Sequence, residues 1–354
     1  MTLTCNSIES KFSCPGVGIE RKSAGFASQG IVTLWKDLSP YGCWQVHDPA
    51  VVWSAEWDLG SRRFRFSKRN QGQARKRVAR ALTLQIGKEI CPGYQLKRLL
   101  GRGGYGYVWQ ADKDDGTPVA LKFLPCGEGL AASKEIRAIS ALSHIRHPNL
   151  ITIEKVWCQA SYLVIEMRLA DGNLLDLLEI CKTEYDAPLP ADQACFYLAQ
   201  AAEGLDFLNA RQHHIDGQMV AIRHCDVKPS NILLFEDKIK LCDFGFSSIN
   251  TSPMQNHRQA GTLDFTAPEV FQGRISEWSD QFSLAITYCV LRGDQLPFAE
   301  TPTQFVANYQ RPEPDLSMLT SAEKPIIYRA LSRVPQDRWP TCKQMMAQLA
   351  KATG

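Results

Sequence analysis

Four polar side chains in the second half of this chain could together transfer a phosphoryl group. Residues 224–231 have the sequence HCDVKPSN, and Asp243 follows Asn231 by 12 residues. Asp226 can accept a proton from a hydroxyl group, and Lys228 can contact the γ-phosphate of a nucleotide. Asn231 and Asp243 carry the oxygen ligands that Mg²⁺ prefers, so they could hold a metal ion between them. The alternative is structural, since aspartate is also frequent in ordinary turns.

The order and spacing of these residues resemble the eukaryotic-type protein kinase family, in which a catalytic loop H-x-D-x-K-x-x-N precedes the triplet D-F-G. The resemblance covers residues 94–350. It implies an α+β, two-lobed protein-kinase fold with a β-rich N-lobe and a helical C-lobe. It also implies an enzyme of intracellular signalling that transfers the γ-phosphate of ATP to a protein hydroxyl, with Mg²⁺ or alternatively Mn²⁺. Lys228 is typical of serine/threonine kinases, and the loop is similar to that of bacterial members.

The elements that would position these side chains begin with a glycine-rich segment. Gly101, Gly103 and Gly106 form a G-x-G-x-x-G pattern with strand-forming residues on both sides. Glycines let the backbone close over phosphates and offer N–H groups to them. The same pattern occurs in dinucleotide-binding proteins, where a helix follows the glycines. Residues 107–111, with the sequence YVWQA, predict a strand instead.

A lysine at the end of an apolar strand favours the kinase interpretation. Residues 119–122 have the sequence VALK, and burying Lys122 is costly unless it has a partner. In the kinase family this lysine binds the α- and β-phosphates and pairs with a glutamate of a helix. Glu135, in the helical pattern of residues 133–145, is the candidate partner. Glu128 is closer to the strand but lies between glycines, which disfavour a helix.

The resemblance also implies which residues form the nucleotide site. Residues 161–167 predict a strand and hinge, where backbone groups around Glu166 would bind adenine and Ile165 would guard the back of the pocket. The residues that would bind ATP are Gly101, Gly103, Gly106, Val108, Ala120, Lys122, Glu166, Met167 and Leu233. The residues that would act in catalysis are Lys122, Glu135, Asp226, Lys228, Asn231 and Asp243, with Asn231 and Asp243 as the metal ligands.

Three charged residues resemble anchors that protein kinases have and small-molecule kinases lack. Asp280 resembles the helix aspartate that braces the catalytic loop. Arg338 resembles the arginine that pairs with the glutamate of the A-P-E triplet, which is Glu269 here. Residues 261–265, with the sequence GTLDF, resemble the stretch that docks a protein acceptor. A kinase of a small molecule is therefore disfavoured. A pseudokinase scaffold, the non-enzymatic alternative, usually lacks a lysine or aspartate that this chain retains.

The catalytic loop departs from the family at one position that bears on regulation. Many members have H-R-D, and the arginine pairs with a phosphate on the activation segment. This chain has Cys225 in place of that arginine. The sequence therefore predicts activity that does not require phosphorylation of the activation segment.

The first 93 residues are less informative. Residues 1–60 are expected to form a small β-rich module, because residues 31–59 contain four tryptophans, β-branched residues and turn signals. Residues 37–42 match the D-x-S-x-x-G element of the PilZ domain, which binds cyclic di-GMP. The arginine pair of that family comes before this element, whereas Arg65 and Arg69 come after it. An ordinary turn is the alternative that we favour.

Residues 61–93 are expected to form a basic linker. No acidic residue occurs from Leu59 to Lys88. Such a run could contact nucleic acid, acidic lipid or an acidic partner, or it could simply be a solvated connection between domains. Only two aromatic residues, Phe64 and Phe66, lie among the basic ones, which argues against a nucleic-acid site.

Composition sets the remaining limits. The chain has 354 residues, a hydrophobic fraction of 44% and a net charge of +3, so it can hold a kinase domain and about 90 further residues. It has no apolar run of about 18 residues, so no membrane span is expected. The 12 cysteines are scattered without two C-x-x-C pairs, which favours reduced thiols and a cytoplasmic location over disulfides or zinc.

Overall fold

The chain divides into two compact units, residues 1–81 and 82–354. In the first unit, the computed structural model describes the backbone of residues 43–48, 51–58 and 63–70. In the second unit it describes residues 84–103, 106–125, 139, 142–159, 162–215, 218–243, 263–301 and 306–354.

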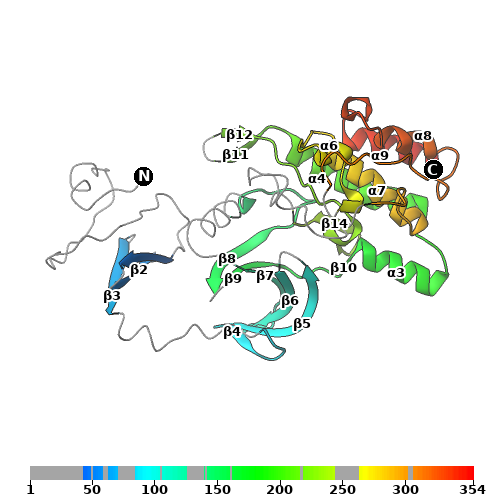
Figure 1. The fold of residues 1–354 in the computed structure, drawn as a ribbon. Helices are drawn as coiled ribbons and strands as arrows, with labels where there is room; N and C mark the ends of the chain where they lie inside the picture. Colours follow the sequence, from blue (N-terminus) through cyan, green and yellow to red (C-terminus); the bar gives the residue numbers. More distant parts are fainter. Residues whose placement is uncertain are drawn as a thin grey trace. The chain divides into compact units, whose positions relative to one another are not determined.

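The first unit contains a three-stranded antiparallel sheet in the order β1-β2-β3 (Figure 1). Its strands are β1 (Cys43–Asp48), β2 (Val51–Asp58) and β3 (Arg63–Asn70). The first two lie where the sequence predicts strands. The third lies inside the expected linker and pairs with β2 from Arg63 to Asn70. Its sequence, RFRFSKRN, begins by alternating basic and aromatic residues, which is the period of a strand. The PilZ-like residues 37–42 lie outside the described residues.

A six-stranded antiparallel sheet forms the N-lobe of the second unit, in the order β4-β5-β6-β7-β9-β8 (Figure 1). A hairpin of β5 and β6 carries the glycine-rich segment, and Gly103 pairs with Gly106 at its tip. A strand, not a helix, therefore follows the glycines, as the sequence predicts. The strands are β4 (Glu89–Cys91), β5 (Tyr94–Gly103), β6 (Gly106–Lys113), β7 (Pro118–Pro125), β8 (Ile153–Gln159) and β9 (Tyr162–Arg168).

The C-lobe is mainly helical, which confirms the predicted α+β fold in two lobes (Figure 1). Its α-helices are α3 (Leu174–Tyr185), α4 (Ala191–Asn209), α6 (Pro268–Phe271), α7 (Ser279–Gly293), α8 (Lys324–Ala330) and α9 (Cys342–Thr353). Short 3₁₀ turns are η2 (Pro229–Asn231), η3 (Leu263–Phe265) and η4 (Pro335–Asp337). Its small strands are β10 (Gly172–Asn173), β11 (His213–Ile215), β12 (Gln218–Val220), β13 (Ile232–Phe235) and β14 (Lys238–Leu241).

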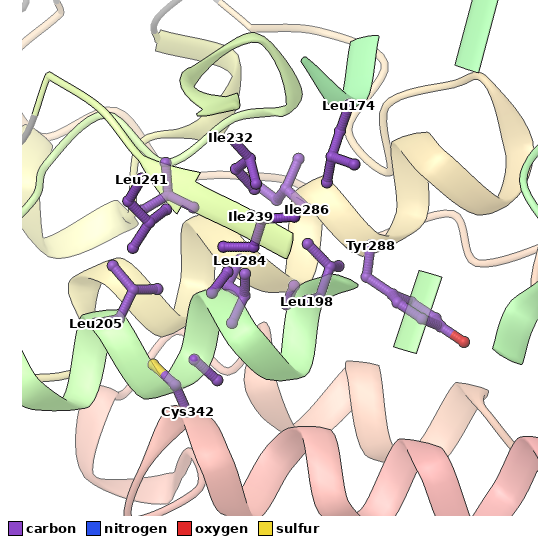
Figure 2. Close-up of a cluster of buried hydrophobic side chains, with 14 of the residues drawn as sticks. Leu174, Leu198, Leu205, Ile232, Ile239, Leu241, Leu284, Ile286, Tyr288 and Cys342 are labelled. Carbon is purple, nitrogen blue, oxygen red and sulfur yellow. The ribbon is translucent and has the colours of Figure 1, made fainter. Parts of the chain in front are cut away.

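Helix α7 lies at the centre of the C-lobe core. Twelve of its 15 residues are buried, including the polar Asp280 and Ser283. A helix that is buried on all sides must pack against several elements at once. Figure 2 shows Leu284 and Ile286 of this helix close to Leu198 of α4 and Ile239 of β14. The C-lobe therefore has a rigid central helix from which polar side chains can hold the surrounding loops.

None of the helices in the described part of the chain has the length and apolar character needed to cross a membrane.

Candidate active site

The catalytic loop is held by hydrogen bonds to the carboxylate of Asp280, at the start of helix α7. The backbone N–H groups of His224 and Cys225 each donate to this carboxylate over 2.8 Å. Cys225 has a left-handed backbone with φ of 62°, a conformation that costs a non-glycine residue about 1–3 kcal/mol. The two hydrogen bonds to a buried charge offset this cost. The predicted contact between Asp280 and the catalytic loop is therefore present.

The loop brings three of the predicted catalytic side chains into contact. Asp226 Oδ2 accepts from Lys228 Nζ over 3.0 Å and from Asn231 Nδ2 over 2.8 Å. Asn231 Nδ2 also donates to the backbone carbonyl of Asp226 over 2.8 Å, which fixes the loop against the start of β13. The other oxygen of Asp226, Oδ1, is buried and makes no hydrogen bond within the described residues. This oxygen is the atom of Asp226 that remains open for the predicted role of proton acceptor.

A lysine of the N-lobe reaches a carboxylate of the C-lobe. Lys122, at 6% exposure, leaves β7, and its Nζ lies 2.5 Å from Oδ1 of Asp243, which follows β14. Burial raises the pKa of Asp243, but the charge and hydrogen bond of Lys122, with smaller effects of His224 and Lys228, outweigh it and hold the pKa below its ordinary value. Asp243 is thus ionised at neutral pH. Glu135 lies outside the described residues, so its pairing with Lys122 stays a prediction.

The donor set of Asn231 and Asp243 fits a hard divalent cation. An amide oxygen and a carboxylate kept ionised are the ligands that Mg²⁺ takes in phosphoryl-transfer sites. Both residues line the same cleft as Asp226 and Lys228. The residues present therefore fit the metal that the sequence implies.

A cleft of about 700 Å³ lies between the glycine hairpin and the catalytic loop. Its size suits a nucleotide, since small-molecule sites generally measure about 300–1,000 Å³. Of the residues expected to bind ATP, it is lined by Gly101, Gly106, Val108, Ala120, Lys122, Met167 and Leu233.

Gly106 shows why the hairpin needs glycine at this position. Its φ is +136°, and a Cβ atom added there would lie 1.9 Å from the backbone oxygen of Phe123. No side chain fits between the hairpin and β7 at this point. The glycine thus lets the backbone of β6 lie directly against the strand that carries Lys122.

Glu166 does not line the cleft with its side chain. Its carboxylate, 1% exposed, accepts from the Tyr94 hydroxyl over 2.6 Å and lies 2.5 Å from Lys113 Nζ. Burial raises its pKa, but the hydrogen bonds from Lys113 and Tyr94 outweigh burial and lower it. Neighbouring residues of a strand alternate between the two faces of the sheet. Met167 therefore lines the cleft, and the side chain of Glu166 lies on the opposite face of the sheet. Only the backbone of Glu166 is available for the predicted adenine contact.

The cleft is also lined by charged residues that were not among the expected site residues. Arg98 and Arg102 come from the glycine hairpin, Arg168 is the last residue of β9, and Asp171 follows that strand. Cys242, which directly precedes Asp243, is buried and also lines the cleft. The sequence could have identified these residues by their positions next to the glycines, the hinge and the D-F-G triplet.

The second predicted anchor of the C-lobe is also present. Arg338 Nη1 and Nη2 donate to the two carboxylate oxygens of Glu269 over 2.9 and 2.8 Å, and both residues are buried. The hydroxyls of Ser276 and Ser279 donate to Glu269 Oε1 over 2.8 Å each. Burial raises the pKa of Glu269, but Arg338 outweighs burial and lowers it. Removing one member of such a buried pair typically costs about 3–5 kcal/mol.

Comparison with known proteins agrees with this geometry. The family model described as protein kinase domain matches residues 94–351. CBL-interacting serine/threonine-protein kinase 7 of Arabidopsis thaliana is 31% identical over 258 residues, which is 69% of this chain and 57% of that protein. Mitogen-activated protein kinase kinase kinase 7 of Drosophila melanogaster is 30% identical over 253 residues, 69% of this chain and 35% of that protein.

Another relative differs in the specificity that its name states. PTI1-like tyrosine-protein kinase 1 of Arabidopsis thaliana is 30% identical over 231 residues, 62% of this chain and 62% of that protein. The chain thus spans less than two thirds of the length of each of these relatives. They come from a plant and an insect and do not bear on the expected similarity to bacterial members.

Proposed function

The chain belongs to the protein kinase family, and we propose that it transfers the γ-phosphate of ATP to serine or threonine hydroxyls of other proteins. The observation that carries this proposal is the arrangement of two polar clusters around one cleft. Asp226, Lys228 and Asn231 form the first cluster, and Lys122 and Asp243 form the second. No member of this set is lost, which argues against a pseudokinase.

Each group has a chemical role in the proposed reaction. Asp226 Oδ1, which has no partner in the described part of the chain, accepts the proton of the acceptor hydroxyl. Lys228 lies beside Asp226 and contributes positive charge next to the reacting groups. Lys122 contributes a second positive charge from the N-lobe side of the cleft. Mg²⁺, held by Asn231 and Asp243, would neutralise phosphate charge when bound.

Serine/threonine specificity rests on narrower support. Lys228 stands two residues after the catalytic aspartate, as is typical of serine/threonine kinases. The printed name of one relative contains serine/threonine-protein kinase, whereas another contains tyrosine-protein kinase. Tyrosine transfer is therefore the alternative that the experiment must separate.

We further propose that the kinase acts in the cytoplasm. Cys181, Cys195, Cys289 and Cys342 are buried thiols rather than disulfides, as expected of a reducing compartment. For the N-terminal unit we propose contact with an acidic partner through the basic residues between 61 and 93. Strand β3 contains four of these residues, Arg63, Arg65, Lys68 and Arg69.

The proposed function is tested with purified protein, Mg²⁺ and γ-labelled ATP. Casein and myelin basic protein serve as protein acceptors, and glucose and glycerol serve as small-molecule acceptors. We expect label on a protein acceptor, released as phosphoserine or phosphothreonine after acid hydrolysis. Label only on phosphotyrosine or only on a small molecule would contradict the proposal. Asp226→Asn serves as the inactive control.

A further inference from the structure

Residues 263–266, which lie shortly before helix α6, have their backbone carbonyls held by two side chains from elsewhere in the C-lobe. Arg311 donates to the carbonyl oxygens of Leu263 (2.6 Å), Asp264 (2.8 Å) and Thr266 (2.8 and 3.0 Å). The hydroxyl of Ser283 donates to the remaining carbonyl, that of Phe265, over 2.7 Å. Side chains therefore hold four consecutive carbonyls, those of residues 263–266.

Arg311 is an unusual residue to find in the core. It is only 2% exposed, and its guanidinium lies 4.7 Å from the ring centre of Phe298 and 5.7 Å from that of Phe282. Burial lowers its pKa to about 10, so it remains charged at neutral pH. In the described part of the chain its hydrogen bonds go to carbonyls and to the hydroxyl of Thr301, not to a carboxylate. A buried cation is costly, so packing alone does not explain this arginine.

We propose that Arg311 is a positioning residue for the protein acceptor and acts by holding residues 263–266 in the shape that docks it. This inference rests on the proposed function, because it assigns acceptor docking to the segment that resembles a docking stretch in the sequence. The planar guanidinium reaches three carbonyls with fixed geometry, which a lysine ammonium cannot reproduce. Within the described residues, Arg311 does not line the nucleotide cleft and does not hydrogen-bond to Asp226, so its removal should leave ATP use intact.

The chain offers a matched control in Arg329. This arginine also donates to two carbonyls, those of Asp337 (3.1 Å) and Arg338 (3.4 Å), and lies 4.1 Å from the ring centre of Trp339. Its hydrogen bonds go to the last residue of η4 and to the residue that follows it, not to residues 263–266. Arg329 is exposed whereas Arg311 is buried, so Arg329→Lys removes arginine-to-carbonyl hydrogen bonds from a different segment without touching a buried cation.

The test compares Arg311→Lys, Ser283→Ala and Arg329→Lys with the unmodified chain. The acceptor is whichever of casein or myelin basic protein takes up more label. We expect Arg311→Lys to raise the KM for the acceptor by about tenfold or more, the effect of losing one hydrogen bond to a charged group. Ser283→Ala should raise it about threefold, and Arg329→Lys should leave it unchanged. The KM for ATP and the rate of ATP hydrolysis without acceptor should stay within about twofold in all three variants.

Hydrogen exchange of the peptide covering residues 263–270 gives a second measurement that needs no acceptor. Exchange there should accelerate in Arg311→Lys and not in Arg329→Lys, because the Thr266 N–H bond to the Leu263 carbonyl loses its support.

The outcomes separate the inference from the proposed function. An acceptor KM and an exchange rate that match those of Arg329→Lys would refute the inference. Equal losses in ATP hydrolysis and acceptor phosphorylation would also refute it, because they would indicate a purely structural role. If Arg311→Lys does not fold, an unchanged acceptor KM in Ser283→Ala would refute the inference. Transfer to tyrosine would contradict the proposed specificity, and the same KM comparison would still test Arg311.

Discussion

Replacing Asp280 by asparagine should slow catalysis without weakening ATP binding. The carboxylate accepts the N–H groups of His224 and Cys225 over 2.8 Å each, whereas an asparagine has one oxygen and one NH₂ group to offer. One charge-assisted hydrogen bond, about 1.5–3 kcal/mol, is therefore lost. The left-handed backbone of Cys225 loses its support, so Asp226 is no longer held in position. If the whole loss appears in the transition state, kcat falls about 10- to 150-fold.

Asp206 provides the control for this prediction. Its carboxylate accepts two successive backbone N–H groups, those of Cys342 (2.9 Å) and Lys343 (3.0 Å), at the start of α9. Asp206→Asn therefore removes the same interaction away from the active site. We expect both variants to lower the thermal midpoint, but only Asp280→Asn to lower kcat measured at saturating ATP and acceptor. Equal kcat values for the two variants would refute the reasoning that Asp280 positions Asp226.

Four further predictions follow from the site. Asp226→Asn should lower turnover about 10²- to 10⁴-fold while nucleotide binding, measured by calorimetry, stays near normal; full activity would remove the assignment. If Lys122 and Glu135 form a pair, the double variant Lys122→Met with Glu135→Gln should be no slower than Lys122→Met alone, and additive losses in turnover would exclude the pair. Because Cys225 replaces the family's arginine, turnover should change less than about threefold when four hydroxyl residues of the activation segment are replaced together by alanine. These residues are Ser247, Ser248, Thr251 and Ser252. Loss of activity after phosphatase treatment would contradict this prediction. Because the pKa of Glu269 in the fold is below its ordinary value of 4.5, its ionised carboxylate stabilises the fold above about pH 4.5. This contribution to the free energy of unfolding is lost as the pH falls through the lowered pKa. A plot of thermal midpoint against pH should therefore be flatter below about pH 4.5 for Glu269→Gln, and parallel curves would contradict the ion-pair assignment.

The expected site residues that the structure brings into contact within the catalytic loop are close together in the chain. Asp226, Lys228 and Asn231 lie within one loop, so their spacing alone brings them together. The anchors Asp280 and Arg338 were identified because the family resemblance supplies partners that are distant in sequence.

The parts that the sequence did not predict depend on tertiary packing. The contact of Arg311 with Thr266 joins residues 45 positions apart, and no motif marks either of them. The orientation of Glu166 depends on strand register and on the cations behind the sheet. Strand β3 was hidden because its basic composition resembles a linker, although Phe64 and Phe66 alternate with arginines as in a strand.

Asp280 and Ser283 are three residues apart, so they leave nearly the same turn of helix α7, a turn that rises about 5.4 Å. Asp280 holds the loop that carries Asp226, the proposed proton acceptor, and Ser283 holds the backbone at Phe265, where the protein acceptor is proposed to dock. The loop with Asp226 and the backbone at Phe265 are thus both attached to helix α7. When thermal motion shifts the helix, the two attachment points shift in the same direction by nearly the same amount. If both proposed roles hold, we expect the separation between Asp226 and the incoming hydroxyl to vary less than either position alone when the lobe moves.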